Sequence, residues 1–249
     1  MFLGTAQYPS PEVLKKTIKE SGAQIITASL RRQNPSNKSG EKFWSFLKAC
    51  NVHLLPNTAG CRTAKEAIAL AFMAREIFKT NWIKLEVIGD DYNLQPDPFE
   101  LVEAARILCQ DGFSVFAYTT EDLVVSKKLY EVGCVAIMPW ASPIGSGQGI
   151  LNLTGLKTLR ARLPHALLIV DAGLGKPSEA ARVMEIGFDG VLVNTAVANA
   201  VDPIRMACAF SQAAQAGRMA YEAGLIKTRD VAIPSTPTLG TPFWHEKPA

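Results

Sequence analysis

Short apolar segments alternate with longer helical patterns along the whole chain, and this alternation constrains the fold more than any other feature. Several of the segments are rich in Val, Ile and Leu, as expected for parallel strands that are buried on both faces. They lie at residues 2–5, 24–28, 52–57, 83–89, 114–119, 135–139, 167–172 and 190–195. Eight strands separated by helices predict an α/β fold, a (β/α)8 or TIM barrel, with a doubly wound open sheet as the alternative.

Local signals between these segments predict where helices begin. Ser10 and Asp202 each stand directly before a proline, which is typical of a helix N-terminus. Thr63 is followed three residues later by Glu66, the pattern of a capping box. Each signal lies between two predicted strands or after the last one, as an alternating fold requires.

The chain has 249 residues, the usual size of a single eight-fold barrel. No change of composition divides the alternating pattern. The sequence therefore predicts one barrel domain that carries the catalytic residues, at residues 1–224. A Pro- and Thr-rich tail at residues 225–249 is predicted to be irregular.

Composition excludes several function classes. The net charge is only +3 and the basic residues are spread along the chain, which does not predict a nucleic-acid surface. Five cysteines lie far apart without metal-ligand spacing, which is typical of a reducing compartment and predicts no metal site. No apolar run reaches the roughly 20 residues needed to span a membrane. We therefore expect a cytoplasmic protein.

Charged residues are rare inside the predicted strands, and only Lys84, Glu86 and Asp171 occur there. Because side chains alternate along a strand, Lys84 and Glu86 share the face opposite Ile83 and Leu85, and should point into the barrel. Burial of charge for stability alone is unfavourable, although a structural ion pair is the alternative interpretation. We expect a desolvated, partly neutral amine that acts as a nucleophile beside a proton-transferring carboxylate. Lys84 lies early in its predicted strand, at residues 83–89.

Polar and glycine-rich turns follow the last strands. Asp171 ends the seventh strand and precedes Ala172 and Gly173, while Asn194 and Thr195 end the eighth. Loops after these two strands are the common phosphate site of such barrels. The glycine-rich loop at residues 143–149 lacks the Gly-Lys-Ser/Thr ending of a Walker A loop. Either a phosphate cradle or a flexible turn is consistent with its spacing.

Five segments together resemble the thiazole synthase family of thiamin biosynthesis. They are Leu-Pro-Asn-Thr-Ala-Gly-Cys at 55–61, Trp-Ile-Lys-Leu-Glu-Val-Ile-Gly-Asp-Asp at 82–91, Pro-Ile-Gly-Ser-Gly at 143–147, Asp-Ala-Gly-Leu-Gly at 171–175 and Asp-Gly-Val-Leu-Val-Asn-Thr-Ala at 189–196. The segments occur in order and cover nearly the whole chain. The run at 82–91 is the most specific of them.

This resemblance implies a sulfur-incorporating transferase. It implies that 1-deoxy-D-xylulose 5-phosphate, dehydroglycine (2-iminoacetate) and sulfur condense into a thiazole phosphate carboxylate. Lys84 would form a Schiff base with the sugar ketone, and Glu86 and Asp171 would move the protons. The phosphate-binding residues implied by the resemblance are Gly145, Ala172, Gly173, Asn194 and Thr195. No metal or other cofactor is implied.

The resemblance also implies partners. Sulfur would arrive as the C-terminal thiocarboxylate of a small carrier protein, and we expect either a homo-oligomer such as a tetramer or a hetero-oligomer with the carrier. Neither nucleic acid nor membrane is expected as a partner. Two other functions remain open from the residues: an aldolase-type barrel that also uses a lysine Schiff base, and a phosphosugar-binding barrel without catalysis.

Overall fold

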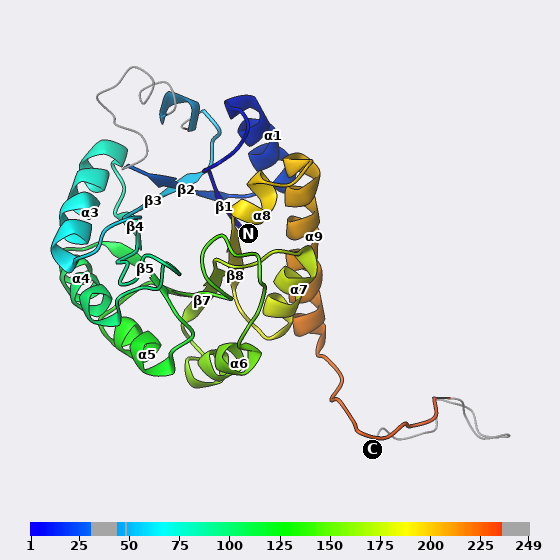
Figure 1. Ribbon diagram of the computed structural model, residues 1–249. Coiled ribbons are helices and arrows are strands. Elements are labelled where there is room, and N and C mark those ends of the chain that lie inside the picture. Colours follow the sequence, from blue (N-terminus) through cyan, green and yellow to red (C-terminus); the bar gives the residue numbers. More distant parts are fainter. Residues whose placement is uncertain (31–43, 48, 236–249) are drawn as a thin grey trace.

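The computed structural model describes residues 1–30, 44–47 and 49–235. Its strands pair in parallel, in chain order, and β8 pairs with β1 to close the barrel (Figure 1). They are β1 (Phe2–Gly4), β2 (Ile25–Ser29), β3 (His53–Asn57), β4 (Trp82–Leu85), β5 (Ser114–Thr119), β6 (Ala136–Pro139), β7 (Leu167–Asp171) and β8 (Gly190–Val193). The predicted (β/α)8 barrel is confirmed, and the open sheet is wrong because the described strands form a closed ring.

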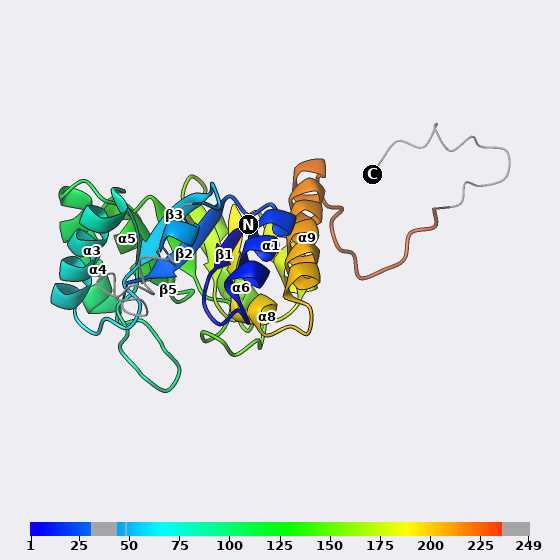
Figure 2. The same cartoon turned by 90° about the horizontal axis from the view of Figure 1, so that it is seen from above.

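Helices surround the strands (Figures 1 and 2). They are α1 (Pro11–Ser21), α3 (Ala64–Phe78), α4 (Pro98–Gln110), α5 (Leu123–Glu131), α6 (Leu153–Arg162), α7 (Pro177–Glu185), α8 (Thr195–Ala198) and α9 (Pro203–Ala223). The long helix α9 packs against both α7 and α1. It therefore joins the last part of the helical ring to the first (Figure 1).

The predicted helix starts are confirmed by their capping hydrogen bonds. The side chain of Ser10 accepts a hydrogen bond from the backbone N–H of Val13 at the start of α1. Thr63 caps α3 in the same way, and Asp202 caps α9. Each cap satisfies one backbone donor that the first helical turn leaves unpaired.

The two faces of the strands pack into separate apolar cores. On β4, Ile83 and Leu85 are fully buried among the side chains between strands and helices. A second, inner cluster consists of Leu55, Phe116, Ala136, Met138, Ile169 and Leu192. Leu55 and Ile169 each lie two residues before a polar residue of the barrel interior, Asn57 and Asp171. The inner cluster therefore closes the barrel below its polar mouth.

Strand β4 ends at Leu85, four residues earlier than the predicted segment 83–89. Beyond Leu85 the backbone hydrogen-bonds to loops: the N–H of Ile88 donates to Cys61, and the carbonyl of Val87 accepts from Asp97. Apolar character alone could not reveal this change of partners. The consequence is that Lys84 is the penultimate residue of its strand, close to the carboxyl end where barrel active sites lie.

The described part of the tail, residues 225–235, is exposed and contains neither helix nor strand. Residues 236–249 lie outside the described residues, so the division into a barrel at 1–224 and a tail at 225–249 stays a prediction. None of the helices in the described part of the chain combines the length and the apolar character needed to cross a membrane.

Close packing of α9 on α7 generates a test of the fold. Gly217 is buried in α9, and a Cβ atom there would collide with the backbone carbonyl of Ala181 in α7. We predict that Gly217→Ala lowers the free energy of unfolding by about 1–3 kcal/mol, although alanine favours helix by about 1 kcal/mol. Urea denaturation measures the change. Gln215→Ala, at an exposed position of the same helix, should stay within about 0.5 kcal/mol of the unmodified protein.

Candidate active site

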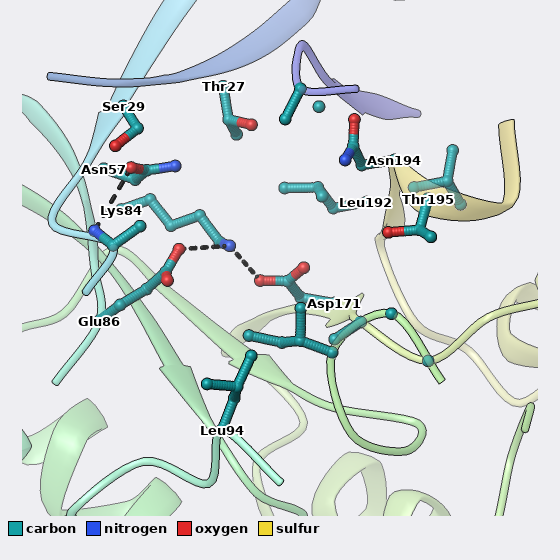
Figure 3. Close-up of a pocket in the computed structure, with 18 of the residues that line it drawn as sticks. Thr27, Ser29, Asn57, Lys84, Glu86, Leu94, Asp171, Leu192, Asn194 and Thr195 are labelled. Atoms are coloured by element: carbon teal, nitrogen blue, oxygen red, sulfur yellow. Dashed lines mark hydrogen bonds and ion pairs between the residues drawn. The ribbon is translucent and has the colours of Figure 1, made fainter. Parts of the chain in front are cut away.

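A cavity of about 540 Å³ opens at the carboxyl ends of the strands (Figure 3). Its walls come from the ends of β1 to β4, β7 and β8 and from the loops that follow β3, β4, β6 and β7. All the residues predicted for the site line it: Lys84, Glu86, Gly145, Asp171, Ala172, Gly173, Asn194 and Thr195. The fold therefore brings together segments that are more than one hundred residues apart in the chain.

Lys84 stands between two carboxylates in the centre of this cavity (Figure 3). Its Nζ atom lies 2.9 Å from Oε1 of Glu86 and 2.6 Å from Oδ2 of Asp171. The three residues are only 6%, 5% and 3% exposed, respectively. Because Asp171 ends β7 and Lys84 belongs to β4, the lysine spans the barrel interior. Its ammonium also lies 5.4 Å from the centre of the Tyr118 ring.

The protonation of Lys84 differs from the sequence-based expectation. Burial lowers the pKa of Lys84, but the charges of Asp171 and Glu86, and the hydrogen bonds to them, outweigh burial and raise it. The expectation of a partly neutral amine in the resting protein is therefore wrong, because desolvation was weighed without the second carboxylate. Burial raises the pKa of Asp171, with Lys84 opposing this shift and Glu86 reinforcing it.

These charges define what the site can do chemically. The ammonium must lose a proton before its nitrogen can act as a nucleophile. Asp171 is the closer of the two carboxylates, and burial raises its pKa, which favours acceptance of that proton. Transfer from Lys84 to Asp171 would leave a neutral amine beside a neutral acid, without separating charges in the buried site.

Thr58 fixes the backbone that carries Glu86. Its hydroxyl, which is fully buried, accepts from the N–H of Glu86 and donates to the carbonyl of the same residue, both at 2.8 Å. The backbone N–H of Thr58 also donates to the carbonyl of Lys84. One side chain thus replaces the strand partner that residue 86 lacks after β4 ends, and it holds the carboxylate beside the ammonium.

Glycines and a buried serine shape the opposite side of the cavity. Ala172 and Gly173 both have positive φ, at 72° and 80°. The hydroxyl of Ser142 donates to the carbonyl of Gly173. A Cβ atom at residue 173 would collide with this hydroxyl. Gly149 donates its N–H to the same carbonyl, which ties the glycine-rich loop at residues 143–149 to the turn after β7. That loop is therefore held in place as part of the cavity wall.

Helices α7 and α8 begin beside these loops. Glu179 accepts from the N–H groups of Gly175 and Lys176, which directly precede α7. At α8, the N–H of Val197 donates to the carbonyl of Asn194, and the first two N–H groups of the helix have no partner within it. Oδ1 of Asn194 is buried and has no hydrogen-bond partner among the described residues. This side of the cavity therefore offers donors and acceptors to a polar ligand.

Sequence reasoning missed several polar residues of the cavity. Thr27 and Ser29 on β2, Asn57 at the end of β3 and Arg62 in the loop after it all line it, and the first three are seen in Figure 3. The hydroxyl of Ser29 is buried without a partner among the described residues. Polar residues at strand ends were the available signal. In the described residues, no group of three or more His, Cys, Asp or Glu is arranged to hold a metal.

Fold and site define a barrel protein whose ligand cavity occupies the place where (β/α)8 enzymes carry their active sites. A model of the family described as thiazole biosynthesis protein ThiG matches residues 1–237. The chain belongs to this family of thiazole synthases, and the predicted resemblance is confirmed.

Curated relatives named thiazole synthase agree with this assignment. The chain is 57% identical over 240 residues to the protein of Bartonella quintana, covering 96% of the chain and 93% of the relative. It is 58% identical over 245 residues to that of Nitrobacter winogradskyi, covering 98% and 94%. The match to the Brucella abortus protein is 58% identity over 243 residues, covering 98% and 95%.

Solved structures show the same architecture. The BexX/CysO complex of Amycolatopsis orientalis matches with a TM-score of 0.82 and 29% identity, covering 92% of this chain and 94% of that one. The 3-hexulose-6-phosphate synthase of Salmonella typhimurium matches with a TM-score of 0.60 and 18% identity, covering 86% and 97%. The second likeness extends to the fold alone.

The double hydrogen bond of Thr58 generates a test of the site. Thr58→Val keeps the shape of the side chain but leaves the N–H and carbonyl of Glu86 without partners. We predict that it lowers the free energy of unfolding by about 1–3 kcal/mol and reduces thiazole formation at least tenfold. Thr58→Ser, which keeps the hydroxyl, should stay close to the unmodified protein in both measurements. Equal losses in the two variants would contradict this role.

Proposed function

We propose that this chain condenses 1-deoxy-D-xylulose 5-phosphate, dehydroglycine and carrier-bound sulfur into a thiazole phosphate carboxylate through a Schiff base on Lys84. Family membership supports the reaction class. One observation carries the mechanism: a buried lysine lies within hydrogen-bond distance of two carboxylates on the wall of a cavity. This arrangement provides a nucleophile and two groups that transfer protons.

Imine formation follows from the position of Asp171. Its Oδ2 atom takes a proton from Lys84, and the free amine attacks the ketone carbon of the sugar. The resulting carbinolamine loses its hydroxyl as water when Asp171 returns the proton. An imine replaces the carbonyl, one water molecule leaves, and Asp171 ends as it began.

Glu86 is the second proton carrier in this proposal. The imine withdraws electrons and makes the C–H bonds beside the imine carbon acidic. Glu86 holds an oxygen 2.9 Å from the lysine nitrogen, so a sugar attached to that nitrogen brings these bonds close to its carboxylate. Enolisation, loss of water and ring closure each require such a transfer. Thr58 keeps this carboxylate in place throughout.

The phosphate of the sugar would bind on the β6, β7 and β8 side of the cavity. Positive φ at Gly145, Ala172 and Gly173 turns these loops into a backbone-lined wall. Asn194 and Thr195 supply side-chain polar atoms and the first amides of α8. A phosphate held there leaves the ketone end of a five-carbon sugar pointing toward Lys84 at the centre of the barrel.

Sulfur delivery by a small carrier protein is supported by the BexX/CysO complex, a solved structure of a similar barrel together with a second protein. The carrier's C-terminal thiocarboxylate would enter through the mouth at the carboxyl ends of the strands. Assembly as a homo-oligomer or as a complex with the carrier stays a prediction, as does the cytoplasmic location.

Reduction of the imine tests this mechanism. We predict that sodium borohydride, added with 1-deoxy-D-xylulose 5-phosphate, attaches the sugar to a peptide that contains Lys84. Lys84→Arg should abolish the adduct, while Lys79→Arg, which changes an exposed lysine at the end of α3, should leave it unchanged. Mass spectrometry of the digested protein identifies the modified residue.

Each competing function predicts a different result of this experiment. An adduct on another residue, or no adduct, would contradict a Schiff base on Lys84 and would support a binding protein without this chemistry. An adduct on Lys84 together with carbon–carbon cleavage that needs no carrier would identify an aldolase-type enzyme instead.

The position of the Lys84 proton predicts the pH dependence of trapping. Asp171 and Glu86 raise the pKa of Lys84, so the ammonium form persists at neutral pH, and transfer of its proton to Asp171 leaves the net charge of the site unchanged. The initial rate of adduct formation should therefore vary little between about pH 6 and pH 9. A rate that rises steadily through this range would show that Lys84 loses its proton to solvent and not to Asp171.

A further inference from the structure

Arg62 is the cationic residue of the cavity that the mechanism above does not use. It follows β3 and lies at the cavity wall, where the only other cation among the described lining residues is Lys84. Lys176, in the turn after β7, does not line the cavity. In the closed ring of strands, β3 and β4 stand opposite β7 and β8. Arg62 therefore lies across the mouth from the proposed phosphate side.

The backbone of Arg62 is fixed while its side chain is exposed. Its N–H donates to Oε2 of Glu66 at 3.0 Å, just before α3 begins. The guanidinium forms an ion pair with Asp91 of the β4–α4 connection, which projects on the mouth side of the barrel (Figure 2). The two side chains are 54% and 67% exposed. Exposed pairs contribute little to stability, so a ligand can exchange for Asp91 at small cost.

The charges of the cavity point to the kind of ligand. Its described charged residues are two cations and three carboxylates: Arg62, Lys84, Glu86, Asp91 and Asp171. Lys84 is matched by Glu86 and Asp171 and, in the proposed reaction, is joined to the sugar. Among the described lining residues, Arg62 is therefore the cation that is left for a second anionic substrate once the sugar has joined Lys84. A planar guanidinium binds a carboxylate through two parallel hydrogen bonds.

We propose that Arg62 binds the carboxylate of the two-carbon imino acid and exchanges Asp91 for it. This inference rests on the proposed function, which brings such a carboxylate to the cavity beside the sugar imine. Phosphate at the β7–β8 side and carboxylate at the β3–β4 side would then hold the two small substrates from opposite walls, with Lys84 between them.

The test separates this role from those of the sugar and of the carrier. Glyoxylate with ammonium serves as the source of the imino acid, and the initial rate of thiazole formation is measured against glyoxylate concentration. We expect Arg62→Gln to raise the half-saturating concentration about 10- to 100-fold, as loss of a charge-assisted hydrogen bond predicts. Arg62→Lys should recover part of this loss. Borohydride trapping of the sugar on Lys84 should be unchanged in both variants.

Two control variants sharpen the result. Lys65→Gln removes an exposed positive charge three residues from Arg62, outside the cavity lining, and should leave half-saturation unchanged. Asp91→Asn removes the competing carboxylate and should lower the half-saturating concentration. If Asp91→Asn raised it as much as Arg62→Gln does, the pair would be a structural link between two loops and the inference would be wrong.

The carrier thiocarboxylate is the other carboxylate source, and its half-saturating concentration is measured in parallel. A rise for the carrier alone would assign Arg62 to the carrier tail and overturn the inference. Unchanged half-saturation for glyoxylate in Arg62→Gln would overturn it as well. Failure of sugar trapping in the unmodified protein, by contrast, would overturn the proposed function.

Discussion

The arrangement on which the rest of the site depends is an ammonium group held between two carboxylates inside a closed barrel. Lys84 from β4 reaches Asp171 at the end of β7, and Glu86 contacts the same ammonium. Below them the inner apolar cluster excludes water, and above them the cavity opens to the loops. Buried charge is tolerated there only because the opposite charges compensate one another. The residues of the cavity wall are therefore arranged around this group.

The alternation of apolar segments was sufficient to predict the barrel, and the rarity of charge inside strands was sufficient to locate Lys84, Glu86 and Asp171. Side-chain direction followed from the period of a strand, since Ile83 and Leu85 are buried on the opposite face. Composition could not predict the protonation of Lys84, because that depends on a balance of opposing effects on its pKa. Desolvation and two nearby carboxylates shift the pKa of Lys84 in opposite directions, and only the distances decide between them.

Residues that act through the backbone were beyond the reach of pattern reasoning. Thr58 belongs to the segment at residues 55–61 that resembles the family, yet its hydroxyl bonds to residue 86 only because β4 stops at Leu85. Glu179 similarly accepts a hydrogen bond from the backbone N–H of Gly175, just before α7. Acidic residues are common in the first turn of a helix, so its sequence position alone does not reveal this contact. Both depend on where a strand or loop ends, which apolar periodicity leaves uncertain by several residues.

The Nζ atom of Lys84 is both the proposed nucleophile and the cation that neutralises two buried acids, so the reaction and the stability of the fold depend on the same group. Removing Lys84 alone would leave Glu86 and Asp171 facing each other without a counter-charge, a loss on the order of 3–5 kcal/mol for broken buried pairs. A descendant of this barrel that abandoned its reaction would therefore gain little by losing the lysine alone. The three side chains form one inherited unit, which evolution can replace together far more easily than one at a time.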